Sequence, residues 1–336
     1  MSLPRRSLLA TLVSTAVVTA AAVTPWAAMA QSPGASAWPS QPVKIVVPTG
    51  PGSSLDLIVR AMGDKLAARW GQPVVVDNKP GAGGMLGIDI AAKATDGHTL
   101  AIGFNGPLAY APYLYAKVPY DPVKDLKAIV MTTSQANVLA VNAEKVPAKT
   151  VAEFVAWAKA QGGKLNFSSL GQGSSAHLTM ELFLAEVGAT GVHVPFNGSP
   201  PAAMAVAQGT ADATWMVAPA LLPHVQSGKV RLLASSSAAK PEGLGQLPSM
   251  AEAGYPKVEA LAWNGLVGPA SLPEAAVRRI NADVNELLAK DAAVRDILAK
   301  GGLTPVGGSA ADFRRFIDAD VARWAPVITK LGVKLQ

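Results

Sequence analysis

The sequence predicts an α/β protein that folds into two lobes. Short apolar runs with strand composition alternate with amphipathic stretches of helical period, and this alternation occurs in two separate blocks. In both blocks, strands end in turns rich in Gly, Ser or Asn that lie directly before a helix. A length of 336 residues suits two domains better than one, and 50% hydrophobic with 15% charged residues allows a large core.

The first 30 residues have the pattern of an export signal. Arg5-Arg6 precedes an uncharged run over residues 8–23, and an Ala-Met-Ala sequence at residues 28–30 provides a small-residue cleavage site. The paired arginines match the twin-arginine motif only in part, so the Sec and twin-arginine routes both stay open. We expect a cleaved signal over residues 1–30, a flexible leader over residues 31–41 and a periplasmic mature protein.

The first block contains strands that end in glycine-rich or Asn-Gly turns. Residues 43–47 form the first expected strand, and Ser53-Ser54 opens a helix in which Ile58, Met62 and Leu66 recur every four residues. Further strands are expected at residues 74–76, 99–103 and 127–131, with a helix that ends near residue 94. Ligands of open α/β sheets bind outside the carboxyl ends of the strands, so these turns are candidate ligand contacts.

The second block begins after residue 137, and the chain returns to the first lobe near residue 259. Its strands are expected at residues 138–141, 165–168, 192–196, 211–217 and 230–235. Its helices are expected to start at the Thr150 capping box, at Ser174-Ser175 and at Ser199-Pro200, with Ser199 as N-cap. A return strand at residues 260–267 leads to tail helices at residues 273–290, 292–300 and 309–331. The lobes are therefore expected to comprise residues 42–137 with 259–336, and residues 138–258.

The stretch from Leu165 to Phe183 has the composition of an anion site. An apolar strand leads into Gly171-Gln172-Gly173, and Ser174-Ser175 then stands where the N-cap of a helix belongs. The first N–H groups of a helix lack internal partners and carry partial positive charge, while glycine lets a ligand approach the backbone closely. The first block repeats this pattern at Gly52-Ser53-Ser54. An ordinary capped helix has the same signature, so this stretch alone leaves both interpretations open.

Two side chains in these turns have alternative interpretations. His177 lies on the first turn of the second-block helix, where it could face a bound anion or serve as a packing residue. Asp56 lies on the first turn of the first-block helix, and its simplest role is to stabilise that helix N-terminus.

The sequence lacks the motifs of common catalytic and metal sites. It contains no cysteine, and its four histidines make no H-x-x-x-H or H-x-H pair, so no metal and no cofactor is expected. It has neither a G-x-S-x-G elbow nor a P-loop. Loss of the signal lowers the formal charge from +6 to +4 and leaves no basic cluster, so nucleic acid is not an expected partner. We therefore expect a binding protein and not an enzyme.

A series of further motifs runs in order over nearly the whole mature chain. They are Trp38-Pro39, Ile45-Val46-Val47-Pro48, Gly50-Pro51-Gly52-Ser53-Ser54-Leu55-Asp56 with Arg60, Asn78-Lys79-Pro80-Gly81-Ala82-Gly83-Gly84, Asp96-Gly97-His98-Thr99-Leu100, Tyr120-Asp121, Leu165-Asn166-Phe167 through His177-Leu178, His193-Val194-Pro195-Phe196-Asn197-Gly198 and Trp263-Asn264-Gly265-Leu266-Val267. In these motifs the chain, from about Trp38 to Val333, resembles the Bug-type solute receptors, the extracytoplasmic binding proteins of tripartite tricarboxylate transporters.

This resemblance implies a two-lobed periplasmic-binding-protein fold of type II that closes on a small organic carboxylate and delivers it to membrane permease subunits. We expect it to act as a monomer. The implied ligand contacts are Gly52, Ser53, Ser54, Asp56, Asn105, Gly106, Gly173, Ser174, Ser175, His177, Asn197 and Gly198. Many relatives carry an aspartate where this chain has Val217-Ala218, which leaves open whether the far end of the ligand is aromatic or aliphatic.

Two other functions stay open at this point. The same lobes could bind a carboxylate and dock on a receptor kinase ectodomain, which would make the protein a sensor. An exported serine hydrolase could instead use Ser174 or Ser175 together with His177.

Overall fold

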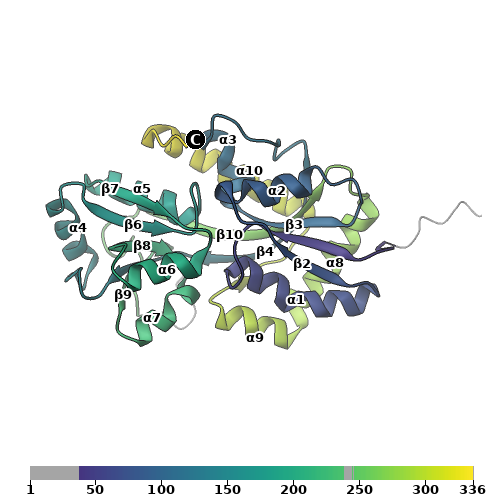
Figure 1. Cartoon of the computed structure of the whole chain (residues 1–336), viewed down its shortest axis with the longest axis horizontal. Helices are drawn as coiled ribbons and strands as arrows, with labels where there is room; N and C mark the ends of the chain where they lie inside the picture. Colours follow the sequence, from purple (N-terminus) through teal and green to yellow (C-terminus); the bar gives the residue numbers. More distant parts are fainter. Residues whose placement is uncertain (1–37, 238–243, 245, 336) are drawn as a thin grey trace, which may run out of the picture. The chain divides into compact units, whose positions relative to one another are not determined.

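The described part of the chain begins beside the first strand. A computed structural model describes residues 38–237, 244 and 246–335 (Figure 1). The expected export signal and residues 31–37 of the expected leader lie outside this range. The sequence predicts a flexible leader up to residue 41, but Trp38 packs edge-on against Trp70 with ring centroids 5.0 Å apart. Its Nε1 also donates to Gly97 O at 2.8 Å. The chain is therefore anchored from Trp38 onward, because an indole buries a large apolar surface.

Two sheets form the framework of the described chain (Figure 1). Lobe 1 contains a six-stranded sheet with the order β11-β4-β10-β3-β1-β2, and lobe 2 contains a five-stranded sheet with the order β7-β6-β8-β5-β9. The strands of lobe 1 are β1 (Val43–Val47), β2 (Val74–Asn78), β3 (Thr99–Phe104), β4 (Leu126–Ala136), β10 (Leu261–Pro269) and β11 (Thr304–Pro305). The strands of lobe 2 are β5 (Val138–Asn142), β6 (Leu165–Ser169), β7 (Gly191–Pro195), β8 (Ala213–Met216) and β9 (Val230–Ser235).

Parallel pairing places the turns of each lobe at one edge of its sheet. β1 pairs in parallel with β2 and β3, and β6 pairs in parallel with β7 and β8. The helices of lobe 1 are α1 (Ser54–Trp70), η1 (Ala82–Gly84), α2 (Met85–Ala92), η2 (Gly106–Tyr110), α3 (Ala111–Leu114), α8 (Glu274–Lys290), α9 (Ala292–Lys300) and α10 (Ala310–Leu331). Those of lobe 2 are α4 (Val151–Ala160), α5 (Ser175–Val187), α6 (Ser199–Ala207), η3 (Ala218–Ala220) and α7 (Leu222–Gln226). The turns before α1, η2, α5 and α6 therefore lie at the carboxyl ends of parallel strands, where ligands of such sheets bind.

The segments that cross between the sheets are tied to each other. β4 and β5 are separated by Asn137, and β10 brings the chain back to pair antiparallel with β4. Asn137 N donates to Ser236 Oγ at 2.9 Å, and that hydroxyl donates to Ala260 O at 2.6 Å. On this basis we propose residues 42–137 with 259–336 as lobe 1 and residues 138–258 as lobe 2.

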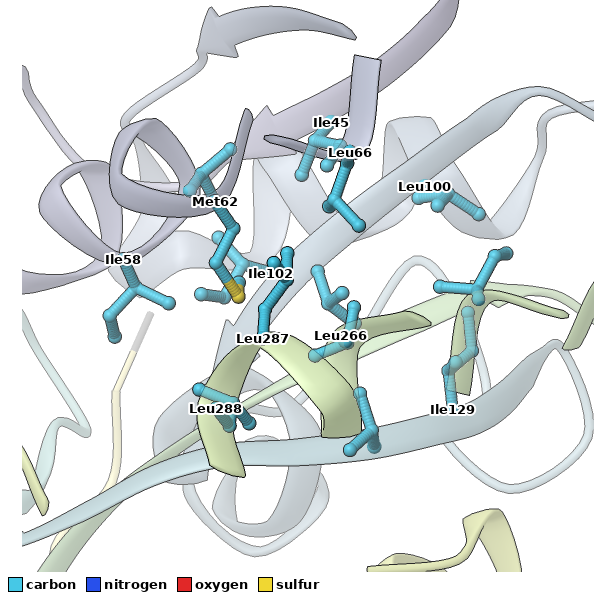
Figure 2. Close-up of a cluster of buried hydrophobic side chains, with 14 of the residues drawn as sticks. Ile45, Ile58, Met62, Leu66, Leu100, Ile102, Ile129, Leu266, Leu287 and Leu288 are labelled. Atoms are coloured by element: carbon cyan, nitrogen blue, oxygen red, sulfur yellow. The ribbon is translucent and has the colours of Figure 1, made fainter. Parts of the chain in front are cut away.

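The core of lobe 1 fixes the position of α1 (Figure 2). Ile58, Met62 and Leu66 lie on one face of α1, as their four-residue spacing predicts, and each is 0% exposed. They pack in a cluster with strand and α8 side chains that include Ile45, Leu100, Ile102, Ile129, Leu266, Leu287 and Leu288. Burial of each such side chain contributes about 1.5–3 kcal/mol. The N-terminus of α1 is thereby held at the end of β1.

Several boundaries differ from those that the sequence predicts. The prediction of Ser199 as an N-cap is wrong by one residue, because Gly198 takes that place with a φ of 126°, a value that favours glycine. β4 continues to Ala136 instead of ending at residue 131, because it pairs with β10 along its length. Within the described range, no helix is long and apolar enough to cross a membrane, and no cluster of three or more potential metal ligands occurs.

Candidate ligand-binding site

The β1–α1 turn presents the N-terminus of α1 to lobe 2. Ser53 is the N-cap, with Oγ accepting the Asp56 N–H at 3.3 Å, and Thr49 Oγ1 lies 2.6 Å from the same oxygen. Across the lobe boundary, Gly50 N donates to Asn197 O at 3.2 Å. The first N–H groups of a helix carry partial positive charge, so this end of α1 favours an anion.

Asp56 lies inside this turn, and its carboxylate is engaged within lobe 1. It accepts hydrogen bonds from Gly52 N at 3.0 Å, Arg60 Nε at 2.9 Å and Asn78 Nδ2 at 3.0 Å. Burial alone would raise the pKa of Asp56, but the hydrogen bond from Arg60 and those from Gly52 and Asn78 hold it below its ordinary value. The carboxylate is therefore ionised at neutral pH and would repel a carboxylate ligand. Because the Asp56 carboxylate accepts the Gly52 N–H, these hydrogen bonds favour a role for Asp56 in holding Gly52 in place.

Asn105, at the end of β3, is held from behind by a chain of buried polar groups. Its Nδ2 donates to Leu261 O at 3.3 Å and to the Tyr110 hydroxyl at 3.2 Å. Since a main-chain carbonyl can only accept, the contact with Leu261 fixes the orientation of the amide. The Tyr110 hydroxyl donates to Asp320 Oδ2 at 2.8 Å, and Trp263 Nε1 donates to the same oxygen at 2.8 Å. Burial raises the pKa values of both Tyr110 and Asp320. Asn105 is thus buried and held in a fixed orientation next to Gly106.

Two glycines of lobe 1 let the lobes approach each other. A Cβ on Gly106 would lie 2.8 Å from the Phe104 ring and 3.0 Å from Gly173 O in lobe 2. A Cβ on Gly83, which has a φ of 62°, would lie 2.6 Å from Gln172 O. A side chain at either position would hold the β6–α5 turn away from lobe 1.

The β6–α5 turn is the counterpart of the β1–α1 turn in lobe 2. Ser174 is the N-cap of α5, with Oγ accepting the His177 N–H at 3.4 Å, and its own N–H donates to Gly171 O at 3.2 Å. Gly173 N donates to His177 Nδ1 at 3.1 Å. Ser174, Ser175 and His177 are all buried. A second Ser-capped helix N-terminus therefore meets the lobe boundary.

The groups that a serine hydrolase would need have other partners in this turn. Ser175 Oγ accepts a hydrogen bond from Asn137 Nδ2 at 2.6 Å, and Ser174 Oγ is the N-cap acceptor. His177 Nδ1 accepts the Gly173 N–H, and His177 Nε2 lies 3.5 Å from Glu181 Oε1. This geometry gives the hydrolase hypothesis no support.

The β7–α6 turn contacts lobe 1 through its main chain. Asn197 O accepts the Gly50 N–H, and the Asn197 side chain is exposed while Gly198 is buried. Gly198 N donates to Leu170 O at 3.2 Å, which ties this turn to the β6–α5 turn. The two turns of lobe 2 therefore form one surface that faces lobe 1.

A cavity of about 20 Å³ lies between these turns. Its walls come from both lobes: Pro48, Thr49, Pro80, Gly81, Gly83, Gly84, Phe104, Leu170, Gly171, Phe196 and Asn197. A volume of this size holds about one water molecule. A carboxylate can therefore enter only when the lobes move apart.

The sequence-based site and these walls overlap only in part. Asn197 is a wall residue, whereas the other predicted contacts lie in or just after the turns that line the cavity. Thr49, Gly83, Gly84 and Gly171 belong to turns that the sequence offers as candidate contacts, but the sequence does not single out these residues as ligand contacts. The position of each turn directly after a strand indicates the turn, not the residue within it that lines the cavity.

At least three larger hollows lie elsewhere on the described surface. One of about 580 Å³ lies among α8, α9 and β11, one of about 480 Å³ lies between α5 and α10, and one of about 460 Å³ lies beside α7 and β9. None of the predicted contacts lines any of these three hollows. The turns that lead into α1 and α5 line the cavity of about 20 Å³ from opposite lobes, so we propose that cavity as the ligand site despite its size.

Two α/β lobes joined by crossing strands, with turns that lead into Ser-capped helices on both sides of one cavity, define the class of two-lobed solute-binding proteins. Residues 58–333 match the tripartite tricarboxylate transporter family receptor, and the chain belongs to this family. The Bug-type resemblance that the sequence motifs indicate is thus confirmed.

Similar proteins agree with this assignment. The chain is 35% identical over 312 residues to protein BugT of Bordetella pertussis, covering 92% of this chain and 95% of BugT. The solved structure of R. palustris Rpa4515 with adipate matches with a TM-score of 0.83 at 32% identity, covering 88% of this chain and 98% of that chain. The solved structure of the periplasmic binding protein BugD matches with a TM-score of 0.83 at 25% identity. The match covers 89% of this chain and 100% of the BugD chain. These likenesses confirm the predicted fold class.

Proposed function

We propose that this protein captures a small organic carboxylate between its lobes, in the periplasm, and delivers it to a membrane permease. The observation that carries the proposal is that the turns leading into α1 and α5, two helices with Ser N-caps, line one interlobe cavity through Pro48, Thr49, Leu170 and Gly171. Helix N-termini attract anions through free N–H groups and the helix dipole. Two of them on opposite lobes suit an acid that is fully held only when the lobes close.

The donors of these turns suffice for a useful affinity. A hydrogen bond to a charged group contributes roughly 1.5–3 kcal/mol, and micromolar binding requires about 8 kcal/mol. About four or five main-chain and hydroxyl donors reach this value after the costs of association. Because the donors are divided between the lobes, binding favours the closed form, which makes all of the contacts.

The family and the relatives support the proposal. The chain belongs to the tripartite tricarboxylate transporter family receptors, and we take a transporter as the partner that receives the acid. Rpa4515 is solved with adipate, and BugD is described as periplasmic. The export signal that the sequence predicts over residues 1–30 agrees with that location. No catalytic step is part of the proposal.

The capture step is tested by asking whether the protein binds an organic acid and leaves that acid chemically unchanged. In a thermal-shift panel of mono-, di- and tricarboxylates that includes adipate, at least one acid should stabilise the fold, by about 2.7 kcal/mol at 100 times its Kd. Mass spectrometry should then recover that acid unchanged. A panel in which no acid shifts the melting temperature or gives a titration signal would overturn the proposal. Consumption of the acid would favour the hydrolase instead.

Uptake and partner capture test the delivery step. Cells that lack this protein should lose uptake of the acid identified in the panel, and the purified protein should recover permease subunits from solubilised membranes. Recovery of a receptor kinase with normal uptake would favour a sensor.

A further inference from the structure

Two stacked histidines lie directly behind the β6–α5 turn. The ring centroids of His177 on α5 and His193 on β7 are 3.8 Å apart, and the ring planes differ by 10°. Phe167 of β6 stacks on both, with centroid distances of 6.2 Å and 5.1 Å. His177 is buried and His193 is half-buried. Two imidazoles at this distance strongly disfavour a state in which both carry a positive charge.

Each histidine bonds to a different part of the turn. His177 Nδ1 accepts the Gly173 N–H at 3.1 Å, and since a main-chain N–H can only donate, this Nδ1 is unprotonated. His193 Nε2 lies 2.7 Å from Ser169 Oγ. That hydroxyl contacts Gly171 O at 2.9 Å and Gly171 N at 3.1 Å. The pair therefore holds the turn at its beginning and at its end.

We infer that His177 and His193 are positioning residues for the carboxylate-binding turn, and that His177 holds the turn in its binding form only while its Nδ1 is unprotonated. This inference rests on the proposed function. A proton on Nδ1 would place two donors face to face at Gly173 and displace that residue. Gly173 O lies against Gly106 of lobe 1, so the displacement would disturb the surface that closes on the ligand.

The groups around the pair limit which charges are possible. Burial lowers the pKa of His193 to about 3, and the neighbouring His177 is a second cause of the shift. The charged group that faces the pair is Glu181 on α5, with Oε1 at 3.5 Å from His177 Nε2. β6 presents Phe167 and Ser169, which carry no charge. His193 therefore stays neutral from neutral pH down to well below pH 5.

Substitutions at His177 separate positioning from packing. His177→Phe keeps a ring in the stack but removes the acceptor for Gly173. His177→Asn keeps an acceptor close to the place of Nδ1, and that acceptor cannot be protonated. Calorimetric titration with adipate, and with the panel acid that binds most tightly, would be done at pH 8 and pH 5.5.

We expect His177→Phe to weaken binding roughly tenfold at pH 8, through loss of one hydrogen bond that orders the turn. His177→Asn should recover most of this loss, and its affinity should fall less than that of the wild type between pH 8 and pH 5.5. Titration of the acid itself is common to both proteins and cancels in the comparison. Melting curves of the ligand-free variants at both pH values show whether each is folded.

The possible failures are distinguishable. A wild type that binds no acid of the panel overturns the proposed function. A wild type that binds, together with a folded His177→Phe of equal affinity and equal pH dependence, overturns the inference. If His177→Phe does not fold, the test depends on His177→Asn. The inference is then overturned if the affinities of the wild type and of His177→Asn fall equally between pH 8 and pH 5.5.

Discussion

Ser53 and Ser174 have the same role on opposite lobes. Each caps a long helix at the lobe boundary, and each is buried. Asp56 accepts the Gly52 N–H, and His177 accepts the Gly173 N–H. We therefore propose that Asp56 and His177 position the two turns and do not themselves contact the ligand.

Replacing the cap of α5 should weaken ligand binding. Ser174→Ala removes a hydroxyl near the anion site and should weaken the best panel acid roughly tenfold, as expected for one lost hydrogen bond to a charged group. It should also lower the free energy of unfolding by about 1 kcal/mol, a typical cost of a lost N-cap. Calorimetric titration and urea unfolding measure these two effects.

Ser309→Ala is the matched control. Ser309 caps α10 in a capping box with Asp312, and it is exposed and belongs to none of the cleft turns. This variant should lose similar stability and keep wild-type affinity. Equal affinities for the Ser174→Ala variant and the control would contradict the assignment of Ser174 to the site.

The carboxylate of Asp56 should stabilise the fold at neutral pH. Asp56→Asn should lower the free energy of unfolding by about 1–3 kcal/mol at pH 7, because hydrogen bonds to an ionised acceptor are weakened. The pKa of Asp56 in the folded protein lies below its ordinary value of 3.8, so this stabilisation is present above pH 3.8 and is lost as the pH falls through the folded pKa. Urea unfolding at pH 7 and pH 3 should show the difference between the two proteins shrinking in acid. A constant difference would contradict this account.

At the scale of secondary-structure elements, the sequence predicts those helices and strands that residues close together in the chain determine. The Ser309 capping box and the spacing of Ile58, Met62 and Leu66 predict α10 and α1 closely. β11 and the full length of β4 depend on pairing with distant strands, which no local pattern records. The site follows the same rule. The positions of the glycine-rich turns could be predicted, but the contact of Gly50 with Asn197 depends on how the lobes meet.

A side chain at the first residue of η2 should hinder closure. Gly106→Ala places a Cβ against Phe104 and Gly173 O, and no positive φ adds backbone strain, so the protein should still fold. We expect the best panel acid to bind at least about tenfold more weakly, a loss of about 1.4 kcal/mol. Calorimetric titration measures this loss.

Gly63→Ala provides the control for Gly106→Ala. Gly63 lies within α1, where a Cβ would meet only Val74 at an ordinary 3.9 Å. This variant should bind like the wild type and gain about 0.5–1 kcal/mol of stability from helix propensity. A Gly106→Ala protein that binds as tightly as Gly63→Ala would show that the lobes need not approach this closely.

At the scale of the whole described chain, we propose that ligand binding and lobe closure are one process. The lobes meet through main-chain atoms and glycines, and the segments that join them are tied together at Asn137, Ser236 and Ala260. The cavity of about 20 Å³ between the lobes cannot admit an organic acid without a change in their separation. Donors from both lobes then make the closed form the one that an acid stabilises.

A crystal structure with the best panel acid bound tests the central claim most directly. We predict electron density for the acid between the lobes, with one carboxylate within hydrogen-bonding distance of the first N–H groups of both α1 and α5. The acid should widen the cavity beside Thr49 and Gly171 while Gly106 stays close to Gly173, without displacing either helix from its own sheet. Density for the acid in the hollow between α5 and α10, or in the one beside α9, with the interlobe turns still in direct contact, would contradict the claim.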